Sequence, residues 1–184
     1  MAQLISEDAI AFGATDSIVS NGFDSYKSED FKLLRQYFYA VLLHGTKTGV
    51  YVNGLYDPFE FAPLLVNAHK KYGKGRAILL ISCMVGWTFA RPLARKTQLP
   101  IVAGLSFVSF GGDFTGTKLH RYLTTLDANG IQLQDSATGQ NNSNVKFRPE
   151  WIFYHPNGNT EVLPGGKFLN QDEAVKHAKL YVKN

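Results

Sequence analysis

The stretch that decides the fold is the apolar run YFYAVLL at residues 37–43, together with a second run, AILLI, at residues 77–81. Each run has the length of one strand, and neither alternates apolar with polar residues. Continuous apolar runs of this length are typical of strands that are buried on both faces, as in a parallel sheet covered by helices. The two runs therefore predict neighbouring central strands of one α/β sheet.

Helical and strand patterns alternate around these two runs. Ser28, followed by two acidic residues, predicts the start of a short helix that continues to residue 36. Apolar residues at helical spacing predict a second helix over residues 58–72 and a third over residues 87–97. LPIVA at residues 99–103 follows as a further strand, with a possible fourth at residues 107–110. The order strand, helix, strand, helix, strand indicates an α/β fold with a mainly parallel sheet flanked by helices.

The two ends of the chain have a different character. Residues 1–28, rich in Ser, Asp, Gly and Ala, are expected to form an N-terminal lead-in to a single domain over residues 29–184. In the C-terminal third, turn residues at 127–130 and at 155–159 predict two β-hairpins. A final helix is expected over residues 171–182.

Composition excludes several classes of protein. With 184 residues, 45% of them hydrophobic, the chain can bury a core without a disulfide. The net charge of +4 comes from scattered residues rather than from one basic face, so no nucleic-acid partner is expected. The N-terminus lacks the pattern of a secretory signal peptide, and no apolar run is long enough to span a membrane.

Metal and cofactor chemistry are not expected either. Cys83 is the single cysteine, which rules out an intrachain disulfide and a site built on several thiolates. His120, His155 and His177 show no ligand spacing, so no metal site is predicted from them.

The residues that end the two apolar strands carry the candidate chemistry. His44 and Gly45 follow the first run, and Ser82 and Cys83 follow the second. If the strands are parallel neighbours about 4.8 Å apart, imidazole and thiol emerge at one edge within mutual reach. Cys83 is then a candidate nucleophile and His44 its general base, as a dyad without a third member. The backbone N–H groups of Gly45 and Cys83 are candidate oxyanion donors, and a following helix N-terminus would favour the thiolate.

Weaker candidates and other interpretations stand beside this dyad. Asp113, in the glycine-rich stretch GGDFTG at residues 111–116, is a weak candidate for binding a basic substrate side chain. The same dyad would also serve a cysteine-dependent deamidase or acyltransferase. A lone cysteine at a strand end is often a small core residue, in which case the chain is a non-catalytic binding module.

An apolar strand ending in His44-Gly45, and a second ending in Ser82-Cys83 some forty residues later, resembles the pattern of caspase-like cysteine peptidases. That group includes caspases, gingipains, clostripain and legumains. FARPLA at residues 89–94 and LPIVA at residues 99–103 are similar to C-terminal toxin domains of bacterial polymorphic and Rhs-type toxins. The resemblance implies a caspase-like sandwich and a thiol protease with a protein substrate. It also implies an effector in bacterial competition, delivered into a target cell by a secretion system or parent toxin, with a cognate immunity protein as partner.

Overall fold

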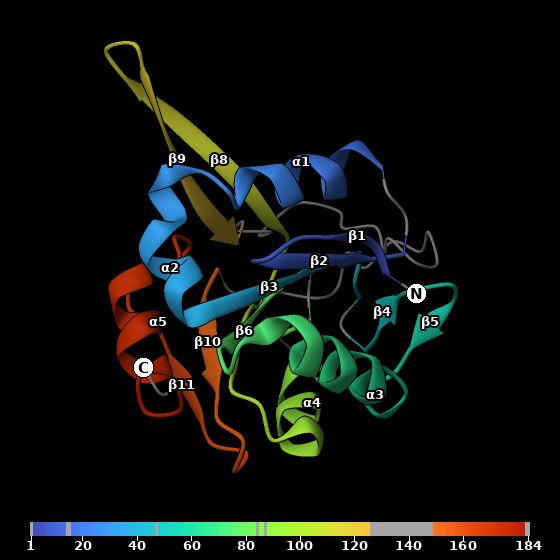
Figure 1. Ribbon diagram of the computed structural model, residues 1–184. Coiled ribbons are helices and arrows are strands. Elements are labelled where there is room, and N and C mark those ends of the chain that lie inside the picture. Colours follow the sequence, from blue (N-terminus) through green and yellow to red (C-terminus); the bar gives the residue numbers. More distant parts are fainter. Residues whose placement is uncertain are drawn as a thin grey trace.

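The computed structural model describes residues 2–13, 16–46, 48–83, 85–86, 88–125 and 149–182. Its centre is a seven-stranded sheet in the order β1-β2-β3-β6-β7-β10-β11 (Figure 1). The strands are β1 (Ala2–Ile5), β2 (Ala9–Phe12), β3 (Phe38–Leu42), β6 (Ala77–Ile81), β7 (Ile101–Gly104), β10 (Trp151–Tyr154) and β11 (Thr160–Val162). Strands β2, β3, β6 and β7 run parallel to one another, whereas β1, β10 and β11 each pair antiparallel. The predicted α/β class, with a parallel centre to the sheet, is confirmed.

Helices cover both faces of this sheet. One face carries α3 (Pro58–Ala68), the π-helical turn His69–Gly73 and α4 (Ala90–Thr97). The other carries α1 (Ser17–Ser25), the 3-10 turn Glu29–Phe31, α2 (Lys32–Tyr37) and α5 (Gln171–Ala178). Along β3, Tyr39 and Val41 pack on the first face while Ala40 and Leu42 pack on the second. Because both faces are covered, every position of this strand is apolar, which explains the continuous run in the sequence.

The N-terminal residues belong to the domain and are not a lead-in to it. Strand β2 lies beside β3, and all four of its residues are buried. Helix α1 packs on the sheet through Val19 and Phe23. The apolar stretches of these elements are short and separated by polar residues, so they do not stand out in the sequence. Those polar residues have structural roles: the Ser6 side chain closes the turn before β2, and the Asp16 side chain caps α1.

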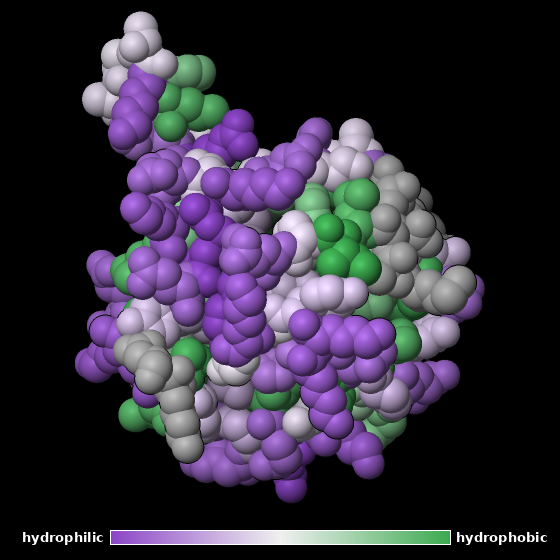
Figure 2. Space-filling view, viewed as in Figure 1, coloured by the Kyte–Doolittle hydropathy of each residue, from purple (hydrophilic) through white to green (hydrophobic). Residues whose placement is uncertain are grey.

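Two hairpins lie outside the main sheet. Strands β4 (Val50–Tyr51) and β5 (Leu55–Tyr56) form a short one, separate from the seven-stranded sheet. Strands β8 (Val108–Thr115) and β9 (Lys118–Thr125) form a longer one that projects from the body of the molecule (Figures 1 and 2). The base of this arm packs against the domain, since the rings of Phe110 and Phe31 lie 5.4 Å apart, edge to face.

The C-terminal predictions have different outcomes. The hairpin around residues 155–159 is confirmed as the antiparallel pair β10–β11, and the final helix is α5. The expected hairpin around residues 127–130 lies outside the described residues. The stretch at residues 111–116 is mostly β-strand, with Gly116 in the turn of the arm at a positive φ of 63°. Over the described parts of the chain, no helix has the length and apolar character needed to cross a membrane.

Candidate active site

The carboxyl ends of the parallel strands meet at one edge of the sheet. Leu42 at the end of β3 pairs with Ile81 at the end of β6. His44 and Cys83 each lie two residues after this pair, so both lie at the same edge of the sheet. This confirms the prediction that the strands before His44 and Cys83 are parallel neighbours.

His44 and Cys83 both line one cavity of about 240 Å³ at this edge. Helix α1 and strand β8 supply its other walls. The lining residues are Ile18, Val19, Asn21, Gly22, Ser25, Leu42, Leu43, His44, Ile81, Ser82, Cys83, Val108, Ser109 and Phe110. His44 is the one ionisable side chain besides Cys83 in this described lining. The cavity suits a neutral substrate group, with the imidazole and the thiol at its wall.

Asp16, which the sequence analysis missed, is a third polar member of the site. Its Oδ2 lies 2.5 Å from His44 Nε2. Asp16 is also the N-cap of α1, since its Oδ1 accepts a hydrogen bond of 3.0 Å from the Val19 N–H. The capping role fixes the carboxylate in front of the imidazole. The signal for it in the sequence is an acidic helix start that follows the short apolar strand at residues 9–12.

Asp16 remains ionised at neutral pH. Partial burial opposes its charge, but the hydrogen bonds from Val19 and His44 and the charge of His44 outweigh this, so the pKa of the Asp16 carboxyl is lowered from 3.8. The contact occupies Nε2 of His44. Nδ1 is therefore the ring nitrogen through which His44 can exchange a proton with Cys83.

The Cys83 thiol lies in a less activating environment than the sequence suggested. Burial raises its pKa above 9.0, and the backbone hydrogen bond from Val108 only partly offsets this. Helix α4 begins at Ala90, so its N-terminus does not directly follow Cys83 as expected. Among the described residues, no hydrogen bond joins Cys83 to His44. The resting thiol is protonated, and its activation requires a base during the reaction.

Gly45 holds the two loops close together. A Cβ at this position would lie 2.2 Å from Ser82 Oγ and 2.8 Å from the Cys83 carbonyl oxygen. Its φ is not positive, so the need for glycine comes from close approach rather than from backbone conformation. Gly45 also forms a β-bridge with Val50, which anchors the segment after His44.

Asp113 does not reach the cavity. It lies near the far end of β8, paired across the arm with His120, and its side chain is exposed. Only the start of the same strand, Val108, Ser109 and Phe110, borders the cavity. The structure therefore brings together Cys83, His44 and Gly45 but leaves Asp113 apart.

A second polar cluster lies where helix α5 meets the β10–β11 hairpin. His155, Glu161 and His177 come together there, although their positions in the sequence show no ligand spacing. His155 and His177 are brought together because α5 packs onto the hairpin and supplies His177, whereas His120 lies apart and contacts Asp30.

Comparison with known proteins adds no assignment: no protein-family model, no curated protein and no solved structure matches this chain.

Proposed function

We propose that this protein is a cysteine peptidase with Cys83 as nucleophile, His44 as general base and acid, and Asp16 as the residue that orients His44. One observation carries the proposal: Cys83 and His44 line the same cavity while the Asp16 carboxylate bonds the far nitrogen of the imidazole at 2.5 Å. A nucleophile, a base and a group that orients the base are the three parts of nucleophilic catalysis.

The chemistry follows from the protonation states of these groups. As Cys83 attacks the carbonyl carbon of the substrate, His44 Nδ1 takes the thiol proton, and the Asp16 carboxylate stabilises the imidazolium that forms. The imidazolium then gives this proton to the leaving amine, and the C–N bond breaks to leave a thioester on Cys83. Water, deprotonated by His44, hydrolyses the thioester and releases the acid product and the free thiol.

General-base activation at the moment of attack fits the raised pKa of Cys83 better than a preformed thiolate does. Catalytic hydrogen bonds in unliganded enzymes often tighten only when the substrate binds. The N–H groups of Gly45 and Cys83 remain the proposed oxyanion donors. Cys83 lines the cavity, and Gly45, which directly follows the lining residue His44, closely approaches Ser82 and Cys83.

The cavity supports a neutral side chain as the group recognised next to the scissile bond. Val19, Leu42 and Phe110 contribute apolar wall, and no Lys, Arg, Asp or Glu occurs in the described lining. This argues against a role for Asp113 in binding a basic substrate side chain.

The caspase-like resemblance is part of the proposal. What supports it is the placement of the His-Gly and Ser-Cys segments at the ends of adjacent parallel strands. A role as a bacterial effector, with a protein substrate in the target cell and an immunity protein as partner, follows from the same resemblance.

The test is expression of the wild type and of Cys83→Ala in a bacterium, followed by proteomic identification of new protein N-termini. A peptidase generates new N-termini only with the wild type. Glutamine or asparagine residues converted to acids, or acyl groups transferred, without new N-termini would favour the deamidase or acyltransferase instead. The same termini in both samples would contradict a role for Cys83.

A further inference from the structure

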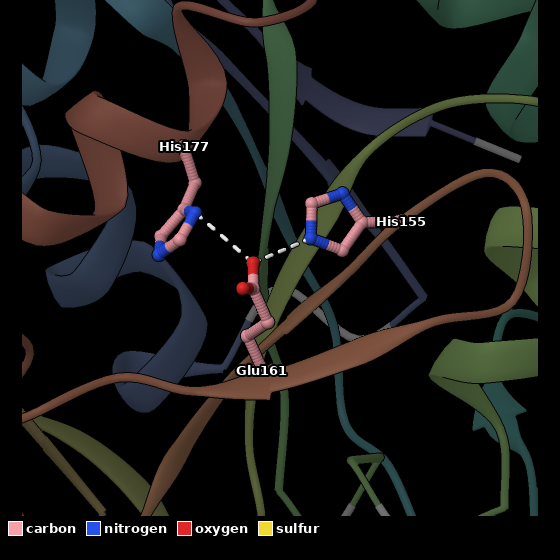
Figure 3. A group of neighbouring side chains, drawn as sticks. All are labelled: His155, Glu161 and His177. Carbon is pink, nitrogen blue, oxygen red and sulfur yellow. Dashed lines mark hydrogen bonds and ion pairs between the residues drawn. The ribbon is translucent and has the colours of Figure 1, made fainter.

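Three side chains from separate elements converge beside the C-terminal hairpin (Figure 3). His155 directly follows β10, Glu161 lies in β11 and His177 lies in α5. Glu161 Oε2 lies 2.6 Å from His155 Nε2 and 3.0 Å from His177 Nδ1. All three possible ligand atoms lie within 4.8 Å of one another.

The surrounding residues fix this cluster in place. The turn between β10 and β11 is closed by hydrogen bonds between the backbones of His155 and Asn159 and of Gly158 and His155. The Phe153 ring packs against His155 and His177, at centroid distances of 4.8 and 5.3 Å. Helix α5 is held to the domain by Ala174, Val175 and Ala178, which are buried. The two imidazoles are therefore largely prearranged.

The cluster combines one carboxylate with two imidazoles, the kinds of group that bind a transition-metal cation. The side chains of His155 and His177 are 10% and 19% exposed, whereas Glu161 is 47% exposed, so the cluster is open to solvent on one side.

Tyr181 adds the outer contact that metal-binding histidines usually have. Its hydroxyl contacts His155 Nδ1. A tyrosine hydroxyl can either donate or accept a hydrogen bond. When a metal ion replaces the hydrogen bond between His155 Nε2 and Glu161, the ring proton sits on Nδ1 and is donated to Tyr181, and the Nε2 lone pair is left for the metal.

We propose that His155, Glu161 and His177 form a zinc site that ties α5 to the β10–β11 hairpin, apart from the Cys83 site. Two imidazole nitrogens and one carboxylate oxygen are a ligand set of zinc, whereas magnesium and calcium prefer oxygen ligands. Ligands about 2.1 Å from a tetrahedral ion lie about 3.4 Å apart, so small side-chain shifts bring the three atoms into position. The fourth ligand is a water from the surface hollow that His155, Glu161 and Tyr181 line.

Calorimetric titration of the chelator-treated full chain with zinc chloride tests the site. The wild type is expected to bind one equivalent of zinc, and magnesium chloride at the same concentration is expected to give no binding. His177→Ala and Glu161→Gln should each weaken zinc binding at least about tenfold, as loss of even outer-shell partners does in zinc sites. His120→Ala and Cys83→Ala are the matched controls and should bind zinc as the wild type does.

A second measurement on the wild type alone covers the case in which a variant does not fold. Zinc should protect His155 and His177 from diethylpyrocarbonate, as mapped by mass spectrometry, and leave His120 reactive. The proposal is overturned if zinc does not bind, if it binds equally to folded His177→Ala and Glu161→Gln, or if it protects neither histidine. Loss of binding in Cys83→Ala would instead locate zinc at the Cys83 site and would also overturn the proposal.

Discussion

Two histidine–carboxylate contacts of nearly equal length lie at different ends of this molecule. Asp16 and His44 approach to 2.5 Å at the carboxyl edge of the sheet, and Glu161 and His155 approach to 2.6 Å beside the C-terminal hairpin. The contact itself is the same in both places. The two places differ in the third group that lies near the contact. At the edge of the sheet it is the Cys83 thiol, which lines the same cavity as His44, and beside the hairpin it is a second imidazole, that of His177. An oriented imidazole next to a thiol supports nucleophilic catalysis, whereas two imidazoles around one carboxylate support metal binding.

The variant Cys83→Ala removes the thiol that distinguishes the first site, and we expect it to cause the largest loss of activity. Loss of the nucleophile should reduce hydrolysis by more than about 10⁴-fold, as in other enzymes whose catalytic groups act as a unit. The fold should persist, because removal of one sulfur leaves only a small cavity. The rate of appearance of new N-termini measures the first effect, and near-ultraviolet circular dichroism measures the second. Residual activity close to that of the wild type would refute the mechanism.

Next in size is His44→Ala, which removes the base but keeps the thiol. General-base catalysis contributes about 10²- to 10⁴-fold, and the loss of turnover should fall in that range. Alkylation of Cys83 should also slow, since the imidazole no longer assists loss of the thiol proton. His120→Ala, which removes a histidine that contacts Asp30 instead, should leave both rates unchanged. Equal rates for the wild type and His44→Ala would remove His44 from the site.

The pH dependence of thiol reactivity separates general-base activation from a preformed thiolate. The reactive form is the thiolate, and burial raises the pKa of Cys83 above 9.0. In the absence of substrate, alkylation of the wild type should therefore be slow at pH 7 and continue to rise beyond pH 9. Measurement of alkylation rates across this range checks the prediction. A plateau reached below pH 7 would indicate a thiolate already formed in the resting protein.

The sequence was sufficient to predict that His44 and Cys83 lie together, but not to predict the residues around them or the second cluster. His44 and Cys83 could be placed on one edge because buried parallel strands have a distinctive continuous apolar pattern, and neighbours in such a sheet share an edge. Asp16 could not, because β2 has only four residues and its pattern does not stand out. The Glu161 cluster could not either, since His177 reaches it through the packing of α5, which no spacing rule records. Of the projecting arm, the sequence predicts only a strand at residues 107–110, because Gly111 and Gly112 resemble a turn.

Asp16→Asn should have a smaller effect than loss of the base. Asparagine keeps the cap of α1, so the change removes the charge that stabilises the imidazolium while preserving the helix start. We expect a loss of about 10- to 100-fold, less than the roughly 10⁴-fold for a buried triad aspartate, because the Asp16 side chain is 43% exposed. Asp57→Asn, at the N-cap of α3 and outside the cavity lining, is the matched control and should keep full activity. Equal losses in the two variants would show that Asp16 acts only as a cap.

The smallest effect is expected at the second cluster, where Glu161→Gln should alter stability without altering hydrolysis. The pKa of Glu161 is lowered in the folded protein, so its charge stabilises the fold above pH 4.5 and loses this effect as pH falls through the folded-state pKa. Because the carboxylate is 47% exposed, the contribution in metal-free buffer should be no more than about 1 kcal/mol. The difference in Tm between the wild type and Glu161→Gln should therefore be a few degrees at pH 7 and shrink below pH 4.5. Glu29→Gln, at an exposed carboxylate in the 3-10 turn before α2, should show no such difference. A Glu161→Gln difference that grows on acidification would contradict a charged Glu161 in the folded protein.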